Sequence, residues 1–146
     1  MYRASLKVKR LSSSATLPRR AHTGDAGVDL YADEDITIAP GAWARIQTGI
    51  AIELPNGTEG QIRPRSGIAA HHGVTVLNAP GTIDASYRGP VDVILINLSS
   101  MPFHVEAGSA IAQLVIAPVV TVDICEVARL EDTERGTKGF GSTGGI

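Results

Sequence analysis

The sequence predicts an all-β fold of about ten short strands. Two observations lead to this prediction: apolar and polar residues alternate with a period of two in many short runs, and glycine and proline stand between those runs. The 146 residues include 16 glycines and 8 prolines, which suit the many turns of such a fold. From the pattern alone, a sandwich, a jelly roll and a barrel all remain open.

Ten runs have the composition or the alternation of strands: residues 6–11, 28–32, 36–38, 42–54, 59–64, 74–77, 91–98, 103–105, 111–118 and 119–127. Gly49 interrupts the longest run, so a β-bulge is expected there. The sequence Pro55-Asn56-Gly57 is typical of a hairpin turn. Residues 65–72 tolerate a helix of at most two turns, so one short helix is expected near residues 66–72.

The composition fits one globular domain that is long enough to bury a core. Apolar residues make up 43% of the chain and aromatic residues only 4%, so the core must consist of Val, Ile, Leu and Ala. The formal net charge of −2 gives no overall attraction to nucleic acid or to an anionic membrane. No apolar run approaches the roughly 18 residues of a membrane span, and the N-terminus has no signal-peptide pattern. We therefore expect a cytoplasmic protein.

The sequence contains no spacing typical of a protein-only metal site. Its single cysteine, Cys125, cannot form an intrachain disulfide and is expected to be a small strand residue. His71 and His72 are adjacent and are expected at the end of the short helix.

Residues 77–89 (L-N-A-P-G-T-I-D-A-S-Y-R-G) gather most of the polar chemistry of the chain. They stand between two β-like runs and contain turn-forming residues, which predicts an irregular hairpin with polar groups at its bend. The polar groups are Asn78, Asp84, Tyr87 and Arg88. Loops on a rigid sheet often carry binding chemistry, although a single Asp at a turn more often only forms the turn.

The composition changes near Leu130. Residues 130–146 are rich in glycine and have almost no core-forming residue, so we expect a body of residues 1–129 followed by a mobile C-terminal arm. The alternative is a disordered tail without a role. The single aromatic residue Phe140, set among Arg135, Lys138, Ser142 and Thr143, argues for a binding arm.

Four other segments combine glycine with a hydroxyl, a cation or an amide: residues 26–30, 64–67, 111–113 and 135–144. Glycine lets a ligand approach the backbone closely, and arginine offers a fork of donors that suits phosphate oxygens. A triphosphate is therefore a natural ligand. No segment matches the Walker pattern or a dinucleotide-binding G-x-G-x-x-G in a βαβ context, so those classes are excluded.

The order and spacing of these segments resemble the five motifs of the deoxyuridine triphosphatase (dUTPase) family. The segments are A-G-V-D-L-Y-A (26–32), P-R-S-G (64–67), N-A-P-G-T-I-D-A-S-Y-R-G (78–89), I-A-Q-L-V (111–115) and D-T-E-R-G-T-K-G-F-G-S-T-G (132–144). The resemblance covers about residues 24–144. It implies a distorted β jelly roll, assembled as a homotrimer whose active sites are shared between subunits.

The resemblance also implies an activity. Family members hydrolyse dUTP to dUMP and pyrophosphate with Mg²⁺ held on the triphosphate, which limits uracil in DNA and supplies dUMP for thymidylate synthesis. Asp84 matches the catalytic carboxylate that orients or deprotonates the attacking water and contacts the 3′-OH. Tyr87 matches the ring that leaves no room for a 2′-OH. Asp29 matches the first-motif carboxylate, which acts on the metal indirectly through water.

The remaining substrate-binding residues are carried over by the same matches. The uracil-reading edge corresponds to Asn78, Gly81, Thr82 and Ile83. Phosphate contacts correspond to Arg65, Ser66, Gly67 and Gln113. The arm that closes over the nucleotide, with its aromatic ring over the base, corresponds to Arg135, Phe140, Gly141, Ser142 and Thr143.

The chain departs from the family pattern at four positions. Ala110 stands where the fourth motif usually has Arg, which removes a cation from the phosphate end. Asp25 replaces a frequent Ser, and Pro90 replaces a frequent acidic residue. Lys138 replaces a common Gly in the arm and could restore part of the missing charge.

Two other functions remain open. A dCTP deaminase would share the fold and the trimer, but it uses a glutamate-centred site and, in its common forms, lacks the closing arm. A nucleotide-gated interaction protein would keep the fold and signal through partners, a reading supported only by Ala110.

Overall fold

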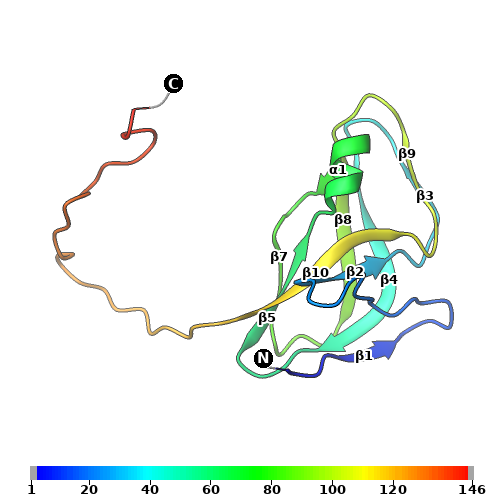
Figure 1. Cartoon of the computed structure of the whole chain (residues 1–146), viewed down its shortest axis with the longest axis horizontal. Helices are drawn as coiled ribbons and strands as arrows, with labels where there is room; N and C mark the ends of the chain where they lie inside the picture. Colours follow the sequence, from blue (N-terminus) through cyan, green and yellow to red (C-terminus); the bar gives the residue numbers. More distant parts are fainter. Residues whose placement is uncertain (1–2, 145–146) are drawn as a thin grey trace.

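The computed structural model describes residues 3–144, and within them it contains ten strands and one helix (Figure 1). The strands are β1 (Lys7–Arg10), β2 (Gly27–Tyr31), β3 (Ile36–Ile38), β4 (Trp43–Glu53), β5 (Thr58–Arg63), β6 (Val74–Val76), β7 (Gly81–Ile83), β8 (Pro90–Asn97), β9 (Phe103–Val105) and β10 (Ala110–Pro118). The helix is α1 (Ser66–His72). The predicted all-β class and the single short helix near residues 66–72 are confirmed.

The strands form two four-stranded antiparallel sheets, in the orders β1-β4-β8-β6 and β2-β10-β5-β7. A third sheet pairs only β3 with β9. The two larger sheets enclose one core, which gives a distorted jelly-roll fold. α1 contains no buried residue and ends at Gly73, whose positive φ of 63° terminates the helix.

The core lies between the two larger sheets and is aliphatic, as the scarcity of aromatic residues predicts. Alternate residues of β4 and β8, among them Ile46, Val93 and Leu95, are at most 1% exposed. Leu30 of β2 and Leu114 of β10 meet them from the other sheet. Each such side chain contributes about 1.5–3 kcal/mol when it is withdrawn from water, so the two sheets hold each other in place.

The bulge predicted at Gly49 is confirmed. The pairing of β4 with β8 shifts register between Gln47 and Ala51. Gly49 has φ +71°, and a Cβ atom there would lie 2.6 Å from a carboxylate oxygen of Asp33 and 2.9 Å from the Ala15 side chain. Glycine is therefore required both by the backbone and by the packing.

The edge strand β1 carries cations on its outer side. The Lys7 ammonium donates a hydrogen bond of 2.8 Å to the Glu53 carboxylate across the β1–β4 pair. This hydrogen bond and the Lys7 charge lower the pKa of the Glu53 carboxyl below its ordinary value. Charged edge residues of this kind discourage pairing with other chains.

The hairpin predicted at Pro55-Asn56-Gly57 is wrong in one respect. The turn is present, but the strands on either side of it, β4 and β5, belong to different sheets and do not pair. A tight turn can equally carry the chain across the sandwich, because the turn residues fix only the local reversal of the chain.

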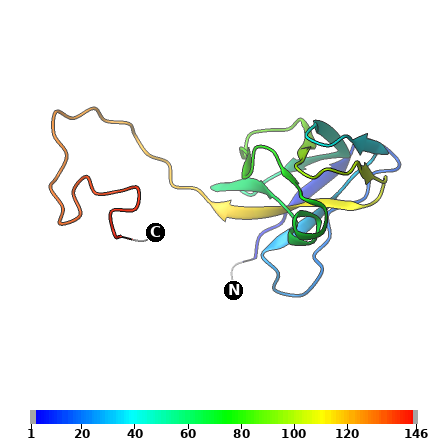
Figure 2. The ribbon, with the colours of Figure 1, turned by 90° about the horizontal axis from the view of Figure 1, so that it is seen from above.

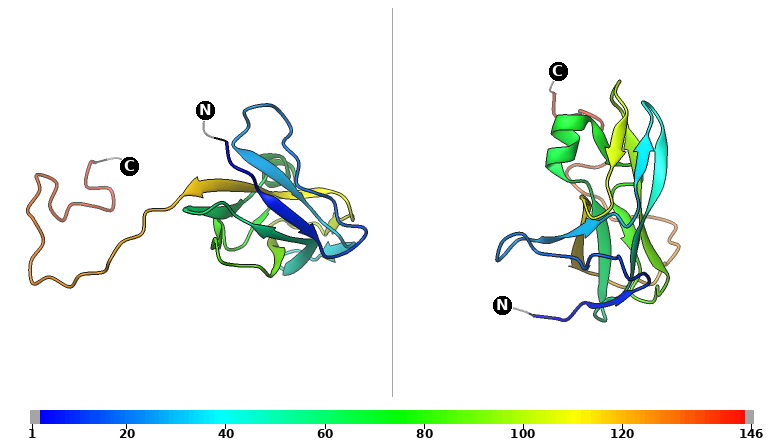
Figure 3. Two further views of the ribbon diagram at one scale, coloured as in Figure 1. Left: turned by 90° about the horizontal axis from the view of Figure 1, so that it is seen from below. Right: turned by 90° about the vertical axis from the view of Figure 1, so that its right-hand side faces the viewer.

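The strand predicted at residues 119–127 is also wrong. After Pro118 no residue up to 127 belongs to a strand, although the Val119 N–H still donates a hydrogen bond of 2.9 Å to the Gly57 carbonyl. Val120, Val122 and Ile124 are 85%, 70% and 99% exposed. Cys125 is accordingly an exposed free thiol and not a packed strand residue. Figures 1 and 2 show the segment leaving the end of β10 and running away from the body, and the left-hand view in Figure 3 agrees. These alternating apolar residues have a strand-like sequence but no partner strand within the described chain.

α1, with seven residues, is the only helix in the described part of the chain, and it is too short to cross a membrane.

Candidate active site

The polar bend is an irregular hairpin, as predicted. Its two legs, β6 and β8, pair antiparallel, with Val76 opposite Leu95. Within the bend, β7 leaves this sheet and pairs with β5 of the other one, with Thr82 opposite Gln61. The bend is therefore bonded to both sheets, which gives the polar residues a firm base.

Asp84 and Tyr87 face one cavity because the chain turns between them. The Tyr87 backbone N–H donates a hydrogen bond of 3.0 Å to the Asp84 carbonyl. Strict strand alternation would have placed the two side chains on opposite faces. The turn within residues 84–87 therefore lets both side chains line the same cavity.

A cavity of about 310 Å³, here called the hairpin cavity, contains the predicted residues of the bend. Its lining includes the six third-motif residues to which the resemblance assigns a role: Asn78, Gly81, Thr82, Ile83, Asp84 and Tyr87. Arg88 is not part of this lining, and its Nη1 donates a hydrogen bond of 2.7 Å to the Ala85 carbonyl. The volume is at the lower end of the range for small-molecule sites. A carboxylate, an amide, an aromatic ring and backbone donors therefore converge on a space that suits a nucleoside.

The hairpin cavity has two charged walls that the sequence did not reveal. Arg45 of β4 and Asp92 of β8 both line it and form an ion pair, with Arg45 Nε 2.6 Å from Asp92 Oδ2. The Asp92 side chain is only 12% exposed. Asp92 lies opposite Gln47 in the β4–β8 pair, and Arg45 stands two residues before Gln47 on the same strand, so the Arg45 side chain can reach Asp92. The pairing register of two distant strands cannot be predicted from either strand alone.

A second cavity, here called the β5–β10 cavity, holds part of the predicted phosphate end. Its volume is about 560 Å³, and its lining includes Ser66, Gln113 and the cation Arg63. Ala79 and Pro80 also line it, whereas the preceding Asn78 lines the hairpin cavity. On β5, Ile62 lines the hairpin cavity while Gln61 and Arg63 line the β5–β10 cavity, so the two cavities lie on opposite faces of that strand.

Gln113 is held in place at the edge of the β5–β10 cavity. Its Nε2 donates a hydrogen bond of 2.9 Å to the Pro64 carbonyl. A Cβ atom on Gly27 would lie 2.5 Å from Gln113 Oε1, so glycine in the first motif makes room for this amide.

Arg65 and Asp29 form a further pair near the fourth motif. Arg65 Nε lies 3.2 Å from Asp29 Oδ1, and Arg65 Nη1 donates to the Ala110 carbonyl at 3.2 Å. The Arg65 side chain is 37% exposed, so part of its guanidinium stays open to a ligand. The contacts orient Arg65 before any ligand binds.

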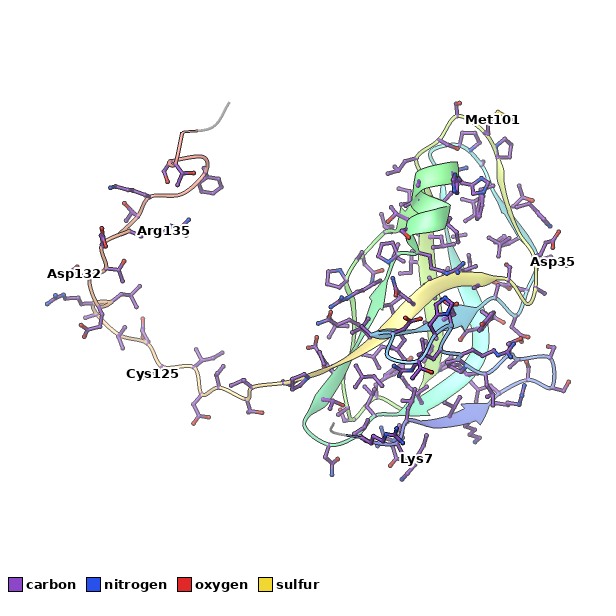
Figure 4. The ribbon with its side chains drawn as sticks, viewed as in Figure 1. Lys7, Asp35, Met101, Cys125, Asp132 and Arg135 are labelled. Carbon is purple, nitrogen blue, oxygen red and sulfur yellow. The ribbon has the colours of Figure 1, made fainter. Side chains whose placement is uncertain are left out.

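The structure does not bring every predicted residue to these cavities. Gly67 lies in α1 with nothing within 4 Å of a Cβ position. The arm residues lie far from the body, as Figure 4 shows for Arg135. Arg135 donates to the Lys138 carbonyl at 2.9 Å, and Phe140 is fully exposed with φ 48°. The arm therefore does not cover the site of its own chain.

No group of three His, Cys, Asp or Glu residues among residues 3–144 could hold a metal ion without help. Asp29 is the first-motif carboxylate, and it is already paired with Arg65. A divalent cation would thus need most of its ligands from a bound phosphate chain, as Mg²⁺ commonly does.

Comparisons with known proteins support one family. The sequence model of the dUTPase family matches residues 13–144. The deoxyuridine 5′-triphosphate nucleotidohydrolase of Clostridium tetani is 58% identical over 96% of this chain and 97% of its own length.

Solved structures agree with the sequence comparisons. A variant of the dUTPase of Staphylococcus bacteriophage 80alpha, solved with dUpNHpp, has a TM-score of 0.90 at 31% identity and covers 96% of this chain and 98% of its own. A variant dUTPase of phage phi11, described with a structural Mg(II) ion, has a TM-score of 0.82 at 26% identity and covers 88% of this chain and 100% of its own. On its motifs, its fold and these matches, the chain belongs to the dUTPase family.

Proposed function

We propose that the protein hydrolyses dUTP to dUMP and pyrophosphate. One observation carries the proposal: Asp84 and Tyr87 turn onto a nucleoside-sized cavity that Asn78 and the residues of β7 also line. The names of the relatives and the dUpNHpp complex of the phage enzyme support the same substrate. The reaction limits uracil in DNA and supplies dUMP for thymidylate synthesis. The cytoplasmic location stays a prediction.

The hairpin cavity is proposed to select the nucleoside. Asn78 and the backbone of Gly81, Thr82 and Ile83 offer donors and acceptors to the uracil edge. A site that hydrogen-bonds a ligand in this way rejects analogues that leave its polar groups unpaired. The Tyr87 ring, on the same cavity, is proposed to occupy the space that a ribose 2′-OH would need.

The chemical step is proposed to use Asp84 as the base. Its exposed carboxylate accepts a proton from water as the water oxygen bonds to the α-phosphorus and the bond to the pyrophosphate oxygen breaks. Arg65 and, after closure of the arm, Arg135 offset the charge that develops on the phosphate oxygens. Ser66, Gly67 and Gln113 orient the chain of phosphates.

Mg²⁺ is proposed to travel with the triphosphate, where it would neutralise phosphate charge. The residues fit an ion held mainly by the phosphates. Asp29 is the one carboxylate assigned to the phosphate end, and it is already paired with Arg65. Asp29 would then reach the ion through water. The phage phi11 enzyme shows that a relative can bind a structural Mg(II) ion.

A homotrimer with shared active sites is proposed because the apolar side chains of residues 119–127 are exposed in the single chain. These side chains alternate as in a strand. Exposed apolar stretches of this kind mark interaction surfaces. A partner subunit would cover them, and it would also bring the arm, with Arg135, Phe140, Gly141, Ser142 and Thr143, to a site other than the arm's own.

A direct assay separates the proposed activity from its competitors. Full-length protein incubated with dUTP and Mg²⁺ should release pyrophosphate, and chelation of the metal should slow release at least about tenfold. Incubation with dCTP should release no ammonia, since neither of the two cavities is lined by a glutamate in the described chain. Ammonia from dCTP would identify a deaminase, and tight dUTP binding without turnover would identify a nucleotide-gated interaction protein.

Ala110 makes a second prediction possible. The variant Ala110→Arg should lower KM for dUTP by roughly tenfold, because one charge-assisted contact with a phosphate, or one further support for Asp29, is regained. Ser109→Arg adds the same charge one residue before β10 and should lower KM less. If KM and kcat of the Ala110→Arg enzyme equal those of the wild type, Ala110 does not weaken binding.

A further inference from the structure

The Tyr87 ring rests on the backbone of the two residues that follow Arg88. A Cβ atom built on Gly89 would lie 2.5 Å from the Tyr87 hydroxyl oxygen, 2.6 Å from Cζ and 3.0 Å from Cε2. The Tyr87 hydroxyl donates a hydrogen bond of 2.9 Å to the Pro90 carbonyl. The phenol end of the ring is thus held by contact with Gly89 and by the hydrogen bond to Pro90.

The backbone conformation at position 89 does not require a glycine. Gly89 is not among the glycines with positive φ, so an ordinary residue could adopt its backbone. The three atoms nearest to a Cβ position, outside its chain neighbours, all belong to Tyr87. The absence of a side chain at position 89 therefore serves the Tyr87 ring.

Pro90 fixes the acceptor of the hydrogen bond. Its ring locks φ and restricts the preceding Gly89 to an extended conformation. Pro90 also begins β8, where it lies opposite Ala51 and precedes the buried Val91. The carbonyl that receives the Tyr87 hydroxyl is thus anchored to the sheet.

The core does not hold Tyr87 in place. The residue is 44% exposed, so the contacts with Gly89 and Pro90 are the restraints that keep its ring on the wall of the hairpin cavity. Steric exclusion of a hydroxyl needs such restraint, because a ring that can swing aside admits the larger sugar.

We propose that Gly89 and Pro90 are positioning residues that set the discrimination between 2′-deoxyribose and ribose by holding the Tyr87 ring in place. The inference rests on the proposed function. It extends that function from the ring itself to Gly89 and Pro90, which need not touch the substrate.

The test compares kcat/KM for dUTP with kcat/KM for UTP in full-length variants. Gly89→Ala should reduce this ratio at least about tenfold, mainly by raising turnover of UTP, because the new methyl group displaces the ring. Tyr87→Phe, which keeps the ring and removes its hydrogen bond, should reduce the ratio about threefold. In a Tyr87→Ala background, Gly89→Ala should change the ratio no further, since the contact it disturbs is already gone.

Gly27→Ala is the matched control. Its methyl group would press on Gln113, 2.5 Å away, in the β5–β10 cavity. It should therefore raise KM for dUTP and UTP by the same factor and leave the ratio unchanged.

The possible results are distinct. Wild-type turnover of dUTP together with an unchanged ratio in Gly89→Ala and Tyr87→Phe would overturn the inference and leave the proposed function standing. No turnover of dUTP by the wild type would overturn both. Should Gly89→Ala fail to fold, the Tyr87→Phe ratio decides alone: a reduced ratio supports the inference, and an unchanged one overturns it.

Discussion

Replacement of Asp84 by asparagine is expected to lower kcat for dUTP about 10²–10⁴-fold, the range for loss of a general base. The amide has the shape of the carboxylate but cannot accept the proton of the attacking water. Asp84 is exposed and lies on the hairpin cavity, so the change should not disturb the core. Pyrophosphate release measures the loss, and calorimetric titration with dUMP should show binding within a few-fold of the wild type.

Asp92→Asn is the control for this experiment. Asp92 is a second carboxylate on the same cavity, but it is engaged with Arg45 at 2.6 Å. Its replacement should cost far less turnover than that of Asp84. If kcat for dUTP fell equally in the two variants, the negative charge of the cavity would be what turnover requires, and Asp84 would not be the base.

Removal of the arm is expected to have the second-largest effect. A chain that ends at residue 134 should lose about 10²–10³-fold in kcat/KM for dUTP, the cost of removing hydrogen-bond donors from a charged transition state. The lost donors include Arg135, Ser142 and Thr143, and the loss of Phe140 uncovers the base. Activity is measured as pyrophosphate release under identical Mg²⁺ concentrations.

The truncated chain keeps residues 119–134, so its assembly can be compared with that of the full chain. Light scattering should give the same number of subunits as in the full-length protein, which would separate loss of closure from loss of the oligomer. Full activity without residues 135–146 would refute closure by the arm.

The sequence predicted elements whose determinants are local. The alternation of β4 and β8 follows from which side of each strand meets the core, and Gly49 marks its own bulge. The failures at residues 55–57 and 119–127 share one cause. A strand-like sequence indicates that a segment can form a β-strand. Which strand it pairs with depends on distant parts of the fold or on another chain.

The same distinction explains what could be predicted of the candidate site. Asp84 and Tyr87 could be predicted because both belong to the third motif and stand only three positions apart in the sequence. Arg45 and Asp92 were missed because they meet only through the pairing of two strands that are far apart in the sequence. The roles of the arm residues stay predictions, because the arm lies away from both cavities of its own chain.

The bend that carries Asp84 hydrogen-bonds to both sheets, through β6 with β8 and through β7 with β5. A ligand held by this bend is therefore linked to the free energy of unfolding of the whole body, because the bend cannot detach without parting the layers. By mass action, a nucleotide at 100 times its dissociation constant would add about 2.7 kcal/mol to that free energy. Deoxyuridine nucleotides would then stabilise the folded enzyme as well as serve as its substrates.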